Sequence, residues 1–264
     1  MQIFRLYGNK PYRAAVIHGG PGAPGEMAPV ASELSSVYGI IEPLQAADSV
    51  VGQVEELLGV LENNADFPLI LIGHSWGAWL SLIFAAEYSS RVAKLILVSS
   101  GPFEEKYAAS ITETRLSRLT EKERSEVTSL MITLNDPEAA DKDEAMSRFG
   151  GLISKADAYD PLSPHSEAIW SQAEIYEKVW PEAAELRHNG KLLALGEKIT
   201  CPVVAIHGDY DPHPYEGVKE PLSRVLKDFK FILLEKCGHQ PWNEREAKDM
   251  FYRILKKEIN IVVG

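Results

Sequence analysis

The stretch Gly73-His74-Ser75-Trp76-Gly77 decides the fold of this 264-residue chain. It follows an apolar run at residues 67–72 and precedes an alanine- and leucine-rich stretch at residues 78–88, which predicts a strand before it and a helix after it. The turn between them must be very tight, and the two glycines leave room where strand and helix nearly touch. This G-x-S-x-G pattern is typical of a nucleophile elbow with an exposed serine hydroxyl. The alternative is a Gly-Ser turn that merely ends a strand.

Further apolar runs predict the rest of a sheet. They lie at residues 13–17, 39–41, 68–72, 94–98, 202–206 and 229–234, with an additional edge strand at residues 2–7. The runs are continuously apolar rather than alternating, which is typical of parallel strands covered on both faces. Helices are expected at residues 25–38, 49–63, 76–88, 215–227 and 243–259. The sequence therefore predicts an α/β fold with a mostly parallel, doubly wound sheet.

The alternation of strand and helix stops between Val98 and Pro202, where helical patterns follow one another. We therefore expect a core made of residues 1–101 and 191–264, with residues 102–190 inserted as a helical cap. Such a cap is a common way to roof a pocket. The tryptophans that could line this pocket, or instead pack in the core or cap, are Trp79, Trp170, Trp180 and Trp242.

Composition narrows the possible partners and location. The chain has 38 acidic against 27 basic residues, a net charge of -11, which argues against binding to nucleic acid. The apolar runs are too short to span a bilayer, and the first residues lack the apolar segment of a signal peptide, so we expect no membrane association and a cytoplasmic protein. Two isolated cysteines, Cys201 and Cys237, indicate reduced thiols rather than a disulfide framework.

An acid and an imidazole follow two of the later strands. Asp209 and Asp211 come after the strand at residues 202–206, and His239 comes after the strand at residues 229–234. Active sites of open parallel sheets form outside the carboxyl ends of the strands, so Ser75, one Asp and His239 should converge. We favour Asp211, because Asp209 beside a glycine is better placed to brace its own turn. A backbone-bonded turn histidine is the alternative for His239.

A glycine-rich loop, His18-Gly19-Gly20-Pro21-Gly22, follows the strand at residues 13–17. Such a loop can direct backbone N–H groups at a point beside the elbow, so the N–H groups of Gly20 and Trp76 are predicted to form an oxyanion hole. The alternatives are a plain turn or a phosphate site, but G-x-G-x-x-G and a Walker lysine are absent. His18 is expected to brace the loop, and His74 to fill a variable position.

No cofactor or metal is expected. His207, His213 and Asp209 could imitate a metal cluster, but their spacing is irregular and no second ligand pair accompanies them. Serine-based hydrolysis also requires neither.

Together these motifs resemble the α/β-hydrolase superfamily, and HGGPG at residues 18–22 with GHSWG at residues 73–77 resembles its proline iminopeptidase-like branch. The resemblance implies a triad of Ser75, Asp211 and His239 and a helical cap after the sixth strand. Members of that branch release N-terminal proline or other small residues, and their relatives cleave esters or acyl-amino amides. The branch binds the substrate's amino group with cap glutamates, for which Glu174 and Glu177 are the candidates.

The function predicted from the sequence is that of a serine hydrolase that cleaves a small amide, peptide or ester through an acyl-enzyme. Its partner would be a small molecule or short peptide. A proline iminopeptidase-like aminopeptidase and a carboxylesterase remain alternatives, and a third is a ligand-binding or interaction protein without catalysis. The sequence carries no signal of oligomeric state.

Overall fold

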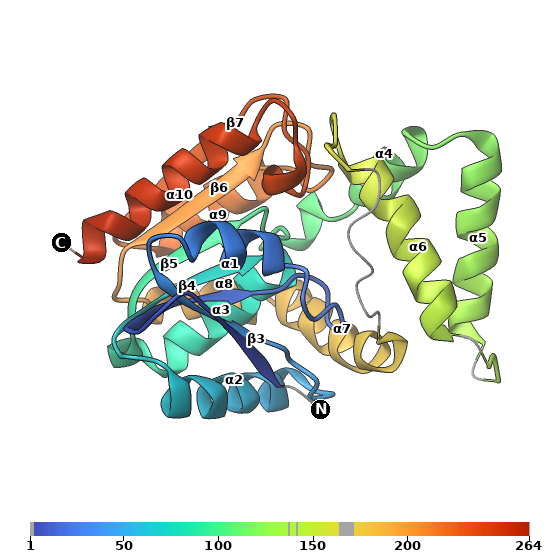
Figure 1. The fold of residues 1–264 in the computed structure, drawn as a ribbon. Helices are drawn as coiled ribbons and strands as arrows, with labels where there is room; N and C mark the ends of the chain where they lie inside the picture. The colour runs from blue at the N-terminus through green and yellow to red at the C-terminus, as the bar shows by residue number, and fades with distance from the viewer. Residues whose placement is uncertain (1–2, 137, 141, 164–171, 264) are drawn as a thin grey trace.

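The computed structural model describes residues 3–136, 138–140, 142–163 and 172–263, which form a seven-stranded sheet between layers of helices (Figure 1). The strands lie in the order β1-β3-β2-β4-β5-β6-β7, with β1 antiparallel to β3 and the other neighbours parallel. The bounds are β1 Phe4–Tyr7, β2 Tyr12–Ile17, β3 Gly39–Pro43, β4 Leu69–His74, β5 Val92–Val98, β6 Val203–Gly208 and β7 Phe229–Leu234. The predicted α/β class and parallel sheet are confirmed. Gln2, which the prediction placed in the edge strand, lies outside the described residues.

Both faces of the sheet are buried, as the continuous apolar runs require. Along β4, Leu69 and Leu71 belong to one hydrophobic cluster, while Ile70 and Ile72 belong to the other. The first cluster is covered by α2 Val50–Asn64, α3 Trp76–Glu87, α8 Lys191–Ala194 and α9 Glu216–Val225. The second is covered by α1 Ala28–Leu34 and α10 Lys248–Val263, so helices flank the sheet on both sides (Figure 1).

The expected helical insertion lies between β5 and β6. Its helices are α4 Ile111–Ser117, α5 Glu121–Asn135, α6 Lys142–Asp157 and α7 Ala173–His188. The pair α5 and α6 is set off to one side of the sheet (Figure 1) and shares a small core with Leu119. By contrast, α7 contributes Val179 and Ala183 to the main hydrophobic core. The division into residues 1–101 with 191–264 and residues 102–190 stays a prediction, and Trp170 lies outside the described residues.

Candidate active site

Ser75 lies in the turn between β4 and α3, with a φ of 52° and a ψ of -114°. Residues other than glycine rarely adopt a positive φ, so the backbone here is strained. A Cβ on Gly73 would lie 2.2 Å from the carbonyl oxygen of Gly77, and a Cβ on Gly77 would lie 2.3 Å from that of Ile17. The two glycines are therefore required by the close approach of β4, α3 and β2.

Two backbone N–H groups beside Ser75 are free to bind a ligand. Gly20 has a φ of 41° in the loop after β2, and Trp76 is the first residue of α3. Within the described part of the chain, neither N–H has a hydrogen-bond partner. The indole of Trp76 is fixed separately, because its Nε1 donates to Oε1 of Gln53 at 2.9 Å. The backbone donor of Trp76 therefore remains available at the start of the helix, where negative charge is favoured.

Asp211 and His239 come from neighbouring loops, after β6 and β7. Nδ1 of His239 lies 2.7 Å from Oδ2 of Asp211. The carboxylate is fully buried, and the imidazole is 12% exposed. Asp209 instead accepts a hydrogen bond from the backbone N–H of Cys237 at 3.1 Å. Of the two acids considered from the sequence, it is Asp211 that contacts the imidazole, while Asp209 braces the turn.

The Asp211 carboxylate and the His239 imidazole each shift the pKa of the other so that its charged form is favoured. Burial by itself would raise the pKa of Asp211, but the electrostatic interactions with the neighbouring histidines, above all His239, and the hydrogen bond from His213 outweigh it and hold this pKa well below its usual value. Burial by itself would lower the pKa of His239, but the Asp211 charge and hydrogen bond outweigh it and raise this pKa. Asp211 is therefore a carboxylate at neutral pH that favours the protonated form of His239.

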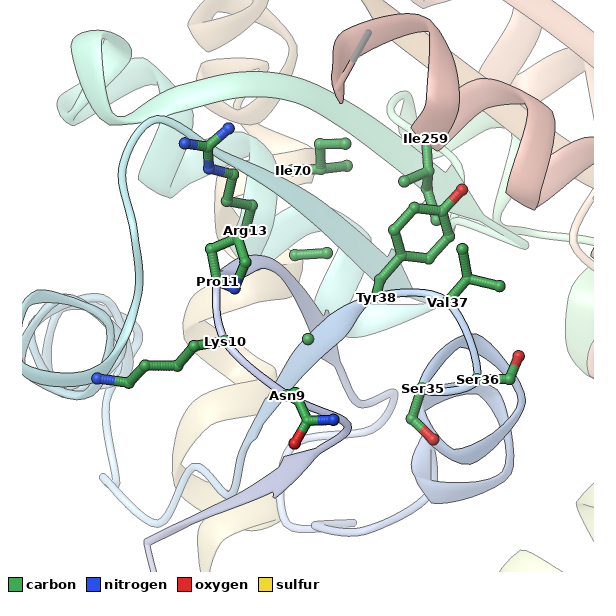
Figure 2. A pocket seen from close by; sticks show the side chains of 12 residues that line it. Asn9, Lys10, Pro11, Arg13, Ser35, Ser36, Val37, Tyr38, Ile70 and Ile259 are labelled. Atoms are coloured by element: carbon green, nitrogen blue, oxygen red, sulfur yellow. The ribbon is translucent and has the colours of Figure 1, made fainter.

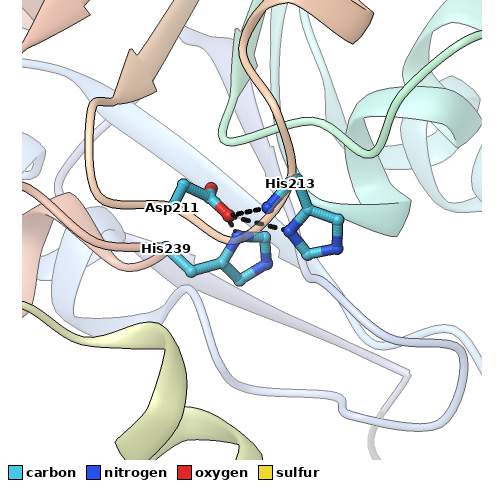
Figure 3. Close-up of side chains that lie close together, drawn as sticks. All are labelled: Asp211, His213 and His239. Atoms are coloured by element: carbon cyan, nitrogen blue, oxygen red, sulfur yellow. Dashed lines mark hydrogen bonds and ion pairs between the residues drawn. The ribbon is translucent and has the colours of Figure 1, made fainter. Parts of the chain in front are cut away.

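His213 is a second imidazole on the same carboxylate (Figure 3). Oδ1 of Asp211 accepts from its backbone N–H at 2.9 Å and from its Nδ1 at 2.8 Å. Burial lowers the pKa of His213 to about 4, so the ring is neutral at neutral pH. The sequence carries one indication of this contact, because an Asp side chain commonly accepts from the N–H two residues later.

Ligand-type atoms of Asp211, His213 and His239 lie within 4.8 Å of one another, which is close enough to consider a metal among the described residues. The hydrogen bonds explain this closeness differently. Both Nδ1 atoms donate to the carboxylate, which occupies the atoms that would bind a cation. The geometry is that of a hydrogen-bonded cluster.

Glu26 and His74 form a network that the sequence did not indicate. Oε2 of Glu26 accepts from the N–H of Gly19 at 2.7 Å and lies 2.9 Å from Nδ1 of His74. Oε1 of Glu26 accepts from Nε2 of Gln240 at 2.9 Å, and Nε2 of His74 lies 2.9 Å from the carbonyl oxygen of His239. His74 is therefore not a variable filler, because it connects the elbow with the loops that carry Gly20 and His239.

Glu244 connects the loop of His239 with the inserted helices. Its carboxylate accepts from the N–H groups of Gly238, Tyr159 and Asp160, each at 2.8 Å. The side chain is buried, so these three bonds replace its contacts with water. The segment after α6 and the loop after β7 are thereby held together.

A cavity of about 1280 Å³ is lined by Gly20, Ser75, Trp76 and His239. It extends under the inserted helices, where Trp79, Tyr176 and Trp180 contribute an aromatic wall. The Trp180 ring is nearly parallel to each of the other two rings, with centroid distances of 5.9 Å to each. The pocket predicted over the carboxyl ends of the strands is therefore present. Trp242 does not line it and packs against His74 instead.

The two cap glutamates lie elsewhere. Glu174 is 77% exposed and pairs with Lys178, while Glu177 pairs with Lys142. Neither is among the residues that line the cavity. Their role as ligands of a substrate amino group stays a prediction that their positions do not support.

A second cavity, of about 330 Å³, lies at the opposite end of the sheet, by the amino ends of β2 and β3 (Figure 2). Lys10, Arg13 and Tyr38 contribute to its wall. It is separated from the site by the length of the parallel strands, because Ser75 and His239 follow their carboxyl ends.

In the described part of the chain, no helix has both the length and the apolar character needed to cross a bilayer.

Comparisons with known proteins agree with this architecture. A family model described as the alpha/beta hydrolase fold matches residues 46–241. No curated protein matches the chain at a significant level of sequence similarity.

Many solved structures share the fold at low sequence identity. VinJ has a TM-score of 0.69 and 15% identity over 98% of this chain and 94% of its own. A thermophilic esterase from Thermogutta terrifontis has a TM-score of 0.65 and 18% identity, covering 98% and 93%. A proline iminopeptidase from Mycobacterium smegmatis has a TM-score of 0.60 and 15% identity, covering 97% and 93%. At such identities the likeness extends to the fold and not to the substrate.

Proposed function

The chain belongs to the α/β-hydrolase family, and on this basis we propose that it is a serine hydrolase with Ser75 as nucleophile, His239 as base and Asp211 as the orienting acid. The observation that carries the proposal is the shared cavity: Ser75 and His239 both line it, and His239 is hydrogen-bonded to the buried Asp211. Membership of the family supports a hydrolase on independent grounds.

In the proposed reaction, Nε2 of His239 takes the proton from the Ser75 hydroxyl as its oxygen attacks the carbonyl carbon of the substrate. The carbonyl oxygen becomes an oxyanion, which accepts hydrogen bonds from the N–H groups of Gly20 and Trp76. When the tetrahedral intermediate collapses, His239 gives its proton to the leaving group, and an acyl-enzyme remains. A water molecule then gives a proton to His239 and attacks the carbonyl carbon of the acyl group. When the second tetrahedral intermediate collapses, His239 returns the proton to the Ser75 oxygen, and the acid product leaves.

The charge distribution of the cavity favours an ester over a peptide with a free amino terminus. Among the carboxylates of the cavity wall, Glu26 and Glu244 already accept several protein donors. Asp157 makes a two-point contact with Arg115, at 2.7 Å for each bond. Glu123 is paired with Lys155, and Glu144, which has no hydrogen-bond or ion-pair partner among the described residues, is exposed on α6. At every buried carboxylate of the wall, a cationic amino group would have to displace one of these partners. We therefore favour a carboxylesterase over an iminopeptidase-like activity.

A side-by-side substrate panel tests this proposal. The purified protein is expected to hydrolyse short acyl esters of p-nitrophenol and to leave prolyl and alanyl anilides uncleaved. Cleavage of the anilides alone would show that the aminopeptidase alternative is right. A fluorophosphonate probe measures the nucleophile separately, and failure to label Ser75 together with absent turnover would favour the non-catalytic alternative.

The pH dependence of kcat/KM is expected to follow His239. The base must be unprotonated to accept the serine proton, and Asp211 raises the pKa of His239 above its ordinary value of about 6.5. Activity should therefore rise with pH, with a midpoint above that value. His213, with its pKa lowered to about 4, should add no step near neutrality. Initial rates at low ester concentration measure the profile, and a midpoint below that of an unperturbed histidine would contradict the assignment.

A further inference from the structure

The inserted helices contact the loop of His239 through the end of α6. Asp157 is the last residue of this helix, and its backbone carbonyl oxygen accepts a hydrogen bond from the N–H of His239 at 3.0 Å. A Cβ on Gly238 would lie 2.1 Å from the same oxygen, so the two backbones lie in direct contact. The position of the proposed base therefore depends on where α6 ends.

The side chain of Asp157 is fixed by Arg115 of α4. Nε of Arg115 donates to Oδ1 of Asp157 and Nη2 donates to Oδ2, each at 2.7 Å. The Asp157 side chain is 5% exposed, so water and salt screen this pair little. A two-point contact also fixes the orientation of both groups, which a single hydrogen bond does not. The pair therefore holds the end of α6 against α4.

The same guanidinium extends toward the acid of the proposed triad. Nη2 of Arg115 lies 3.5 Å from Nε2 of His213, whose Nδ1 donates to Asp211 (Figure 3). Because Nδ1 is the donor, Nε2 of the neutral ring is the nitrogen that can accept. A distance of 3.5 Å makes this a weak hydrogen bond. The main connection of the pair with the triad is therefore the bond between Asp157 and His239.

Other contacts hold the same segment without the ion pair. Nη1 of Arg118 donates to the carbonyl oxygen of Ala156 at 3.0 Å, and its guanidinium lies 3.7 Å from the centroid of the Tyr210 ring in the loop after β6. Glu244 accepts from two N–H groups of the segment that follows α6. Loss of the Arg115 contact should therefore shift the end of α6 without unfolding it.

We propose that Asp157 is a positioning residue for His239, and that its ion pair with Arg115 makes the inserted helices part of the catalytic apparatus as well as the roof of the cavity. The Asp157 carboxylate accepts two charged donors, and without it the end of α6 would relax and carry the His239 backbone with it. The catalytic consequence rests on the proposed function, whereas the contact between Asp157 and His239 does not.

Asp157→Asn tests the positioning role in the full chain. The asparagine keeps the size and the backbone carbonyl oxygen, but its N–H₂ group faces one of the two Arg115 donors, so one bond is lost. We expect kcat for a short acyl ester of p-nitrophenol to fall about 10- to 100-fold, because small displacements of a reacting group are costly. KM should change little. A higher KM with unchanged kcat would show that Asp157 binds the substrate instead, and would overturn the positioning role.

Glu126→Gln is the matched control. Glu126 of α5 makes a similar two-point contact with Arg148 of α6, and it is not among the described residues that line the cavity. The variant therefore removes one carboxylate from an arginine pair within the inserted helices, as Asp157→Asn does. Among the described residues, the Glu126 side chain bonds only to Arg148, so kcat and KM should stay unchanged.

Hydrogen exchange measures the contact itself. The amide proton of His239 should exchange slowly in the unaltered protein and in Glu126→Gln, because it is bonded to the Asp157 carbonyl oxygen. In Asp157→Asn it should exchange about 10-fold faster or more, whereas the amide protons of β4 should keep their rates. An unprotected His239 amide in the unaltered protein would overturn the proposal. So would an Asp157→Asn protein with a lower Tm and an unchanged kcat, because the pair would then serve stability alone.

These outcomes separate the positioning role from the proposed function. Labelling of Ser75 by a fluorophosphonate should slow in Asp157→Asn by about the same factor as kcat. A protein that neither labels nor hydrolyses esters would fail the proposed function, yet hydrogen exchange would still decide whether α6 holds His239. If Asp157→Asn does not fold, as judged by circular dichroism, Arg115→Lys takes its place. It keeps the charge but loses the two-point contact, so kcat should fall in the same way, and an unchanged kcat would overturn the proposal.

Discussion

Replacing Ser75 with alanine is expected to lower kcat for ester hydrolysis by about 10⁵- to 10⁶-fold, because the covalent route disappears when the attacking oxygen is removed. A small residual rate should remain, since the Gly20 and Trp76 N–H groups can still polarise a bound carbonyl. The side chain of Ser75 caps no N–H of α3, so its removal should not disturb the helix. Burst and steady-state kinetics with an acyl ester measure the effect.

Ser99 provides a matched control for this substitution. It lies at the end of the next strand, β5, has a φ of 45°, is buried, and its Oγ has no hydrogen-bond partner among the described residues. Ser99→Ala therefore repeats the same chemical change in a similarly strained backbone, one strand away. It should retain full activity. If Ser75→Ala also retained full activity, Ser75 would not be the nucleophile.

Replacing Asp211 with asparagine is expected to lower kcat by about 10⁴-fold with little change in KM. The carboxylate accepts from Nδ1 of both His239 and His213, whereas an amide presents an N–H₂ group to one of them. Oδ1 of Asp211 also accepts from the backbone N–H of His213, which favours the amide oxygen on that side and turns the N–H₂ group toward His239. His239 would then carry its hydrogen on Nε2, the nitrogen that must accept the serine proton. Steady-state kinetics should be measured at a pH above the pKa of His239. The loss caused by the wrong tautomer is then separated from the loss caused by a shifted pKa of His239.

Asp209→Asn is the control for the second prediction. Asp209 accepts one hydrogen bond, from the N–H of Cys237, and an asparagine carbonyl oxygen can accept the same bond. The turn and the activity should therefore be preserved. A large loss in Asp209→Asn with none in Asp211→Asn would reverse the assignment of the acid.

Sequence patterns predicted the sheet well because burial on both faces produces continuous apolar runs, and these do not depend on distant partners. Helix ends were harder to predict. A helix was expected at residues 25–38, but α1 spans Ala28–Leu34. Gly25 has a φ of 92°, which is not helical, and Pro29 suits a first turn. At the other end, the Ser35 and Ser36 hydroxyls bond back to carbonyl oxygens.

The last helix was predicted from residue 243, but α10 begins at Lys248. Glu244 belongs to the loop that holds Gly238, so its backbone precedes the helix. Such polar networks join residues far apart in the chain, as Glu26 and Gln240 do. Each of these residues looks like an ordinary surface residue in the sequence, and only the folded chain brings the donors and acceptors together.

The three hydrogen bonds on Glu244 also limit how this protein could be re-engineered or diversify in evolution. Exchanging the inserted helices for those of another hydrolase would replace the segment whose backbone places the N–H groups of Tyr159 and Asp160 on the carboxylate, while Glu244 and the loop of His239 would stay behind. A buried carboxylate without its donors destabilises the segment that holds it. A new set of inserted helices is therefore best transferred together with the loop that carries His239 and Glu244, so that the carboxylate keeps its donors.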